Sequence, residues 1–373
     1  MTNTTNSGNL DASAGGEPGT VLMVAQAFKE THTVREIADA MARGADRAGF
    51  PAEIVLGADG GNDFVQVLDI DSLICDEILV TGPLKTPVSI AVPWLEPGVA
   101  ALESSLVCGL ALVSPEERNP AKTTTRGLGE AVTAIAELGA HTILVGLGGS
   151  ATMDGGTGMA SAWGWRFEDE DGYPIPEGGG HLGRLARIVS ATKPDVELVG
   201  IADVQNCLFG PSGARVYARQ KGADPETEDI LDGGLMRLAE VLNESGPGGL
   251  AHVEGAGAAG GLGFGLMAFG GAKIIRGAEW VLERVGFDGL LARARAVLVA
   301  EAGFDRTSGM GKLSGEVLAR ALSAGVPVGL VAPTASQVPA GVAVETGGGF
   351  WDLEEVALRT ESLLNELLRL PQG

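Results

Sequence analysis

The chain has 373 residues, of which 45% are hydrophobic, and its formal net charge is −22. This length allows two domains, and the hydrophobic content is sufficient for a packed core. The acidic charge, without any basic run, excludes nucleic acid and an anionic membrane surface as expected partners. Residues 1–20 are polar and glycine-rich, without the basic and apolar regions of a signal peptide, so we predict a disordered N-terminal tail.

The three cysteines lie far apart and show neither the spacing of a zinc site nor that of a disulfide framework. No apolar run is long enough to span a bilayer. We therefore expect a cytoplasmic protein, and association of identical chains stays open.

The first predicted elements form a strand, a loop and a helix. Residues 21–28 are a continuous apolar run, typical of a buried strand. Thr33 and Glu36 have the spacing of a capping box, and apolar residues follow at helical intervals until Gly49 and Pro51. Residues 53–61 then predict a second strand and a turn, and 75–113 predict several strands with little helix.

The remaining chain alternates helices and strands. Helices are predicted over 122–140, from 153, within 222–250, beyond the glycine-rich tract 251–274, and after Leu313. Strands are predicted at 141–149, at 196–204, near 328 and within 296–305, where a loop follows the strand, and an amphipathic helix is predicted at 353–370. This order predicts an α/β fold with two α/β domains and mainly parallel sheets. We assign 21–62 plus 290–373 to the first domain and 63–289 to a domain inserted in it.

Charged residues recur where predicted strands end. Because the carboxyl ends of parallel strands share one edge of a sheet, several such residues favour a binding or catalytic site, although each alone is more often a cap or turn residue. They are Lys29, Asp59, Asp154, Asp203, Glu301 and Asp305. The sequence has no Walker A motif, no GxGxxG after the first strand and no cluster of histidines.

Two glycine tracts, GLGGSAT and GAGAAGGLG, are candidates for phosphate binding. Glycines let backbone N–H groups approach phosphate oxygens, and a following helix adds its positive end. Tight packing between helix and sheet is an equally good explanation of either tract alone. The candidate phosphate or substrate contacts are Gly148, Gly149, Ser150, Gly257, Gly260 and Gly261. Lys221 and Lys312 lie beside glycines and can hold a phosphate or carboxylate as point charges.

Long segments resemble the bacterial glycerate kinase family, the type I glycerate 2-kinases. The resemblance runs from about Val21 to Ala332. The matching segments, in order, are VAQAFKE, GADGGNDFVQVL, VTGPL, SPEERNPAKTTTRGLGE, VGLGGSATMDGGTGM, ADVQNCLFGPSGARVYARQKGA and GAGAAGGLGFGLMAFGGA. It implies transfer of the γ-phosphoryl group of ATP to D-glycerate, with Mg²⁺, to give 2-phosphoglycerate. It also implies two α/β domains, one inserted in the other, with the active site in the cleft between them.

On this interpretation the glycine tracts cradle the phosphates of ATP. Asp203, Lys29 and Lys312 are the predicted catalytic residues, with Asp203 as base or metal ligand. The predicted metal ligands are Asp59, Asp154, Glu301 and Asp305, and Lys221 is a predicted anchor for phosphate or carboxylate.

The chain departs from the family pattern in three segments. Gln26 and Ala27 replace an aspartate and a serine, and Asn62 replaces a glutamate. In 299–307 the family's arginine and glutamine are Gly303 and Thr307. These changes keep two alternatives open: a kinase for another small hydroxy acid, and a non-catalytic protein that binds a nucleotide or metabolite.

Overall fold

The structure is a computed structural model that describes residues 19–28, 31–58, 64–65, 73–246, 248–306, 308 and 312–369. The chain forms two compact units. The first comprises Met1–Leu56, Gly286–Asp305 and Val317–Gly373, and the second comprises Gly57–Val285 and Arg306–Glu316. The predicted divisions, at 62 and 290, lie later in the sequence than the junctions after Leu56 and Val285, and the prediction assigned 306–316 to the first domain. The predicted tail, 1–20, lies outside the described residues except for Gly19 and Thr20.

The first unit is built on a parallel five-stranded sheet with the strand order β15-β13-β11-β1-β2. Its strands are β1 (Val21–Ala25), β2 (Ala52–Leu56), β11 (Ala296–Ala300), β12 (Gly303–Phe304), β13 (Val328–Val331), β14 (Thr334–Ala335) and β15 (Val342–Glu345), of which β12 and β14 pair separately. Its helices are α1 (Val34–Ala48), α8 (Phe287–Leu291), α10 (Leu353–Arg369) and, from Val317 on, α9 (Leu313–Ser323). The chain runs from β1 to β2 on one side and resumes at β11 on the other.

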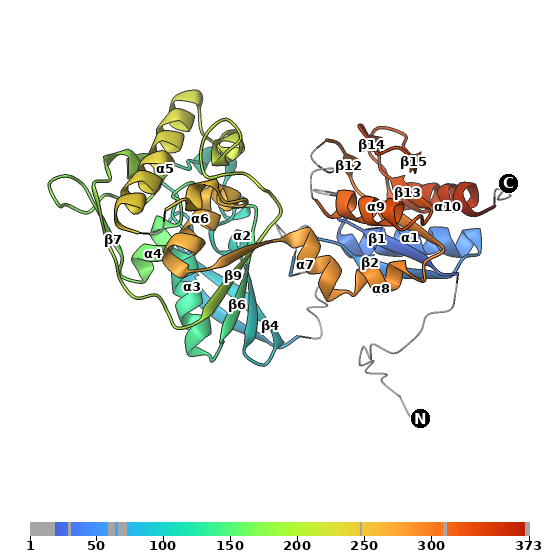
Figure 1. Cartoon of the computed structure of the whole chain (residues 1–373), viewed down its shortest axis with the longest axis horizontal. Coiled ribbons are helices and arrows are strands. Elements are labelled where there is room, and N and C mark those ends of the chain that lie inside the picture. The colour runs from blue at the N-terminus through green and yellow to red at the C-terminus, as the bar shows by residue number, and fades with distance from the viewer. Residues whose placement is uncertain are drawn as a thin grey trace. The chain divides into compact units, whose positions relative to one another are not determined.

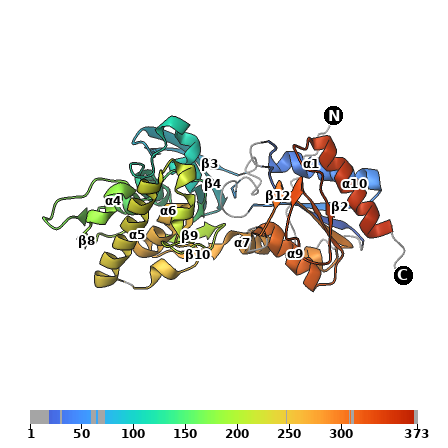
Figure 2. The same cartoon turned by 90° about the horizontal axis from the view of Figure 1, so that it is seen from above.

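Local signals at α1 act as the sequence predicts. The Thr33 hydroxyl accepts from the backbone N–H of Glu36, whose carboxylate accepts from the backbone N–H of Thr33. Gly49 ends the helix in a left-handed conformation. Helices α1 and α10 lie side by side (Figures 1 and 2), and a Cβ on Gly44 would lie 2.5 Å from the carbonyl oxygen of Ala357. Glycine thus permits this close helix contact, and the predicted terminal helix is confirmed.

The second unit contains a six-stranded sheet with the order β10-β9-β6-β5-β4-β3. Strands β5, β6, β9 and β10 are parallel, whereas β3 and β4 are antiparallel. The strands of the second unit are β3 (Cys75–Thr81), β4 (Pro87–Glu96), β5 (Val99–Glu103), β6 (Thr142–Leu147), β7 (Arg166–Glu168), β8 (Arg187–Val189), β9 (Glu197–Ala202) and β10 (Lys273–Arg276), of which β7 and β8 pair separately. The prediction of mainly parallel sheets is confirmed, with an antiparallel edge on this one.

The helices of the second unit are α2 (Ser104–Cys108), α3 (Arg126–Glu137), α4 (Thr157–Ala162), α5 (Pro225–Ser245), α6 (Ala258–Gly270) and α7 (Gly277–Arg284). Short 3₁₀ helices are η2 (Leu110–Leu112), η3 (Pro115–Glu117), η4 (Gly179–Arg184), η5 (Ala214–Tyr217), η6 (Arg219–Lys221) and η7 (Leu250–His252). No described helix is long and apolar enough to cross a membrane.

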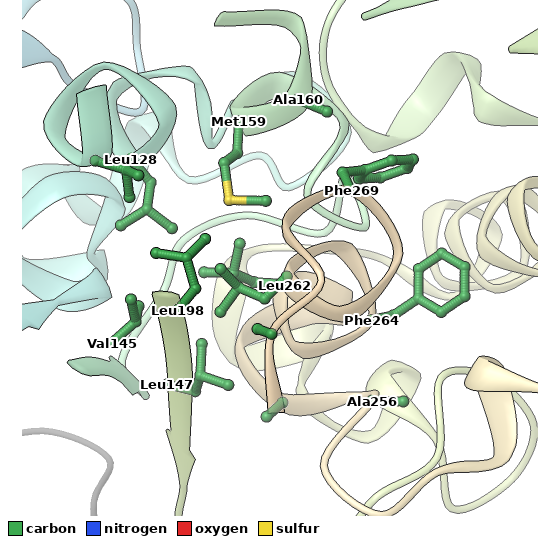
Figure 3. Close-up of a cluster of buried hydrophobic side chains, with 14 of the residues drawn as sticks. Leu128, Val145, Leu147, Met159, Ala160, Leu198, Ala256, Leu262, Phe264 and Phe269 are labelled. Carbon is green, nitrogen blue, oxygen red and sulfur yellow. The ribbon is translucent and has the colours of Figure 1, made fainter. Parts of the chain in front are cut away.

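The larger core of the second unit packs α3, α4 and α6 against one face of the sheet. In Figure 3, Leu147 of β6 and Leu198 of β9 lie close to Leu262 of α6, and all three are buried. A separate cluster with Phe64 and Leu144 covers other side chains of the sheet. Covered sheet faces leave the carboxyl ends of the parallel strands as the place where polar side chains gather.

Candidate active site

The parallel register aligns four strand ends in the second unit. Arg276, the last residue of β10, pairs with Ala202 of β9, which also pairs with Leu147 of β6. Glu103, at the end of β5, pairs with Gly146 of β6. The residues that follow these strands therefore share one edge of the sheet, and they include Asp203, Gly148 and Ser104.

Asp203, the predicted base, is half-buried directly after β9. Burial, together with the nearby charge of Asp203, raises the pKa of Tyr217 to about 12. The Tyr217 hydroxyl donates to the side-chain oxygen of Asn206 over 2.9 Å, and the Asn206 amide donates to the carbonyl of Ser212. Asp203 therefore stands in a polar group whose neighbouring phenol stays protonated at neutral pH.

Arg276 is a cation at the same sheet edge that the sequence analysis missed. Arg276 is the last residue of the short strand KIIR, so it fits the pattern of charged residues at strand ends. Because the strand follows a glycine-rich tract directly, the sequence did not predict it as a separate strand. The guanidinium donates to the carboxylate of Glu279 over 2.9 Å. When the Gln205 amide is turned so that its oxygen faces Arg276, this oxygen also accepts from the guanidinium. Its side chain is 39% exposed, which leaves it able to meet an anionic ligand.

Lys221 is buried, whereas the sequence predicted a ligand anchor. Its ammonium donates to the Ser150 hydroxyl over 2.8 Å and to the Thr152 carbonyl over 2.9 Å. Only 3% of its surface is exposed, and burial lowers its pKa to about 8, against the opposing effect of Cys108 and Asp154. These contacts make Lys221 a support for the turn after β6.

The glycines of that turn are held by backbone contacts. The Ser104 hydroxyl donates to the carbonyl of Gly148 over 3.1 Å and accepts from its N–H group. The carbonyl of Gly149 accepts from the N–H group of Leu110. This turn is therefore fixed in place at the sheet edge, beside the end of β9.

Asp154, a predicted metal ligand, is 1% exposed and joins two helix starts. One carboxylate oxygen accepts from the backbone N–H and the hydroxyl of Thr125 and from the N–H of Gly158, and the other accepts from the N–H of Gly156. Burial raises its pKa, and these donors oppose the rise. Four hydrogen bonds suit a cap of α3 and α4 and leave poor access for a metal ion.

The second glycine tract packs against the first. A Cβ on Gly260 would lie 1.9 Å from the carbonyl oxygen of Thr152, and one on Gly261 would lie 3.0 Å from Cα of Gly155. A Cβ on Gly257 would lie 2.1 Å from the carbonyl oxygen of Cys207. Residues 259–261 are left-handed, so the regular part of α6 begins after them. Packing accounts for these three glycines, and phosphate contact stays a prediction.

The other predicted site residues lie after β11 or at the start of α9, or fall outside the described chain. Glu301 is half-buried after β11, and Asp305 is exposed a few residues later. Lys312 is half-buried at the start of α9 and is grouped with the second unit. Lys29 and Asp59 lie outside the described residues. Within the described part of the chain, no three histidine, cysteine, aspartate or glutamate residues gather as a metal cluster.

Comparison with known proteins identifies the family. The chain matches the glycerate kinase family over residues 21–366. The chain belongs to the glycerate kinase family. It is 38% identical over 322 residues to the glycerate kinase of Bacillus subtilis (strain 168), with 83% of each chain covered. It is 35% identical over 305 residues to the glycerate 2-kinase of Escherichia coli (strain K12), with 79% of each chain covered.

A solved structure named glycerate kinase 2, from Salmonella typhimurium LT2, superposes with a TM-score of 0.78 at 30% identity. The match covers 94% of this chain and 98% of that one. The predicted family and the predicted α/β fold are therefore confirmed.

Two of the segments that depart from the glycerate kinase pattern meet in the first unit. The backbone N–H of Gln26, after β1, donates to the carbonyl of Ala300 at the end of β11, over 3.1 Å. Gly303 follows shortly in β12, and Asn62 lies outside the described residues. The departures at 26–27 and 299–307, distant in sequence, thus lie at adjacent strand ends.

Proposed function

We propose that the protein transfers the γ-phosphoryl group of ATP to D-glycerate and forms 2-phosphoglycerate. The observation that carries the proposal is the glycerate kinase match over residues 21–366, which extends through both units. The polar groups at the carboxyl edge of the second unit support it, because ligands of α/β proteins bind at such edges.

Asp203 and Arg276 are the groups we assign to the reacting hydroxy acid. The Asp203 carboxylate accepts the proton of the attacking hydroxyl, and the protonated Tyr217 beside it does not compete for that proton. Arg276 holds the substrate carboxylate or offsets charge as the phosphoryl group moves. A chain of net charge −22 needs such a local cation to retain an anionic substrate.

A magnesium ion fits part of the predicted ligand set. Mg²⁺ commonly binds through one or two carboxylates and the phosphates of its substrate, so a cluster of three acidic residues is not required. Glu301 and Asp305 would hold it, while the four hydrogen bonds to Asp154 argue against that residue. The ion would neutralise phosphate charge when bound. Our proposal leaves Lys29, Asp59 and Lys312 in their predicted roles.

A coupled assay for ADP release with ATP, Mg²⁺ and D-glycerate tests the activity. We expect turnover that depends on both substrates, and 2-phosphoglycerate as the product by NMR. A panel of small hydroxy acids tests the alternative that Gln26 and Gly303 favour, a kinase for another acceptor. Absence of turnover with every acid, together with calorimetric ATP binding, would instead support the non-catalytic alternative.

The variant Gly303→Arg restores the arginine of the family pattern and tests whether its role is missing in this protein. A large gain in activity would mean that the lost side chain limits the reaction in this protein. A Cβ at this position would lie 3.0 Å from the Thr334 hydroxyl, so Thr334 must shift slightly.

The cytoplasmic location and the association of identical chains stay predictions. Cell fractionation tests the first, and size-exclusion chromatography tests the second.

A further inference from the structure

Gln26 carries an unpaired amide nitrogen inside the first unit. The residue follows β1 directly and is 8% exposed. Its side-chain Nε2 is buried and has no hydrogen-bond partner among the described residues. A buried amide without a partner costs folding free energy, and most such groups in proteins are paired. Retention of this group therefore needs an explanation beyond packing.

The position of Gln26 points to a ligand. Strand β1 pairs with β2 on one side and with β11 on the other. From β1 the chain adds β2 on one side, and from β11 it adds β13 and β15 on the other, so the strand order reverses between β1 and β11. In open parallel sheets, ligands bind outside the carboxyl ends of the strands where the strand order reverses. Gln26 directly follows β1 at this point and donates its backbone N–H to the carbonyl of Ala300, and Glu301 directly follows the neighbouring β11.

The chemistry of Gln26 and Glu301 indicates which class of ligand can bind here. An amide N–H₂ group is a donor and needs an oxygen acceptor. A bare anion would be repelled by the carboxylate of Glu301, whereas an anion that arrives with a divalent cation would not. Phosphates of a nucleotide bind in this form. Rotation about the Cγ–Cδ bond exchanges the positions of amide nitrogen and oxygen, so the nitrogen can turn toward a ligand.

We propose that the Gln26 amide donates a hydrogen bond to a phosphate oxygen of a magnesium–nucleotide complex at the β1–β11 edge of the first unit. The choice of nucleotide rests on the proposed kinase function. The unpaired amide is then the free form of a binding group, and its missing partner is supplied by the ligand. Gln26 is a binding residue on this proposal and takes no part in proton transfer.

The test compares Gln26→Met with the wild type and with Gln220→Met, a matched change at an exposed glutamine of the second unit. Methionine keeps the length of the side chain and removes the unpaired donor. We expect the thermal midpoint of Gln26→Met to be equal or higher. We expect its affinity for a non-hydrolysable ATP analogue with Mg²⁺ to fall about tenfold or more by calorimetry. Gln220→Met should change neither quantity.

Each other outcome is decisive. Unchanged nucleotide affinity in Gln26→Met, or no binding of the analogue by the wild type, overturns the proposal. A thermal midpoint several degrees lower means that the amide is structural and overturns it as well. A loss confined to D-glycerate, with the analogue still bound, places the substrate carboxylate at this site instead. Nucleotide binding that depends on Gln26 without any turnover leaves this inference standing and rejects the kinase activity.

Discussion

The ammonium group of Lys221 donates a hydrogen bond to the hydroxyl of Ser150 across 2.8 Å in the interior of the second unit. The same ammonium holds the Thr152 carbonyl. Two residues 71 positions apart in sequence thus fix the turn that follows β6. Because Lys221 is buried and holds this turn, it supports the geometry of the candidate site, and its predicted role as a ligand anchor stays a prediction.

This buried cation should make stability depend on pH. The pKa of Lys221 is lowered to about 8 from an ordinary value of 10.5, so between these values the unfolded chain binds more protons than the folded one. Its contribution to stability is complete above the ordinary value and is lost as the pH falls through about 8. We expect the wild type to gain about 2 kcal/mol relative to Lys221→Met between about pH 7 and about pH 10.

Urea unfolding of both proteins at the two pH values measures this difference. Comparing the two proteins cancels the titration of groups that do not interact with Lys221. Lys85→Met, a change at an exposed lysine, is the control and should follow the wild type at both pH values. A stability difference between wild type and Lys221→Met that does not vary with pH would contradict the prediction.

Asp154→Asn should destabilise the second unit strongly. The carboxylate accepts four hydrogen bonds from the starts of α3 and α4, and an asparagine would turn a donor toward some of those N–H groups. We expect a loss of about 2–4 kcal/mol in the free energy of unfolding by urea. Asp224→Asn, which alters the exposed cap of α5 but keeps a good capping residue, should cost well under half of that. Equal losses of unfolding free energy in the two variants would argue against the role of Asp154 as a cap for both α3 and α4.

The sequence predicted the order of helices and strands well, because the signals are local. The apolar run of β1 and the capping box of α1 each depend on neighbouring residues. Strand-end positions also predicted that Asp203 would lie at the edge of a parallel sheet. The register between strands then aligns Arg276 with Ala202, the residue before Asp203, a relation that one strand cannot reveal alone.

Local sequence patterns did not predict features that depend on contacts between residues far apart in the sequence. A lysine beside glycine is usually exposed, and Lys221 is buried only because η6 packs against the turn after β6. From the sequence alone, packing and phosphate binding explained the glycines of 257–261 equally well. The two roles differ in which groups surround the glycines in the folded protein. The nearby Thr152 carbonyl supplies a packing reason that no spacing of residues encodes.

Gly260→Ala tests that packing reason. Its φ is +72°, and a Cβ would lie 1.9 Å from the Thr152 carbonyl, so both strain and a clash with backbone are introduced. We expect either insoluble protein or a loss above about 3 kcal/mol in the free energy of unfolding. Gly249 also has a positive φ, of +86°, but open space around it, and Gly249→Ala should cost only about 1 kcal/mol. Similar losses would mean that backbone strain alone decides.

Arg276→Gln tests the cation at the carboxyl edge. If the guanidinium holds the substrate carboxylate, the KM for D-glycerate should rise by about 10–100-fold, with a smaller effect on the KM for ATP. Arg276→Lys should recover part of the loss, because an ammonium keeps the charge but not the paired donors. Steady-state kinetics with each substrate varied in turn measures these effects.

The control for Arg276 is Arg166→Gln, which removes an exposed arginine from β7 and its ion pair with Glu168. It changes the net charge equally, so a general electrostatic effect on an anionic substrate would appear in both variants. A local effect should leave the Arg166→Gln kinetics near those of the wild type. Since Arg276 also contacts Glu279, thermal midpoints of both variants must be compared. A loss of activity matched by a fall in the midpoint would assign Arg276 to structure, whereas a selective rise in the KM for D-glycerate at constant midpoint assigns it to substrate binding.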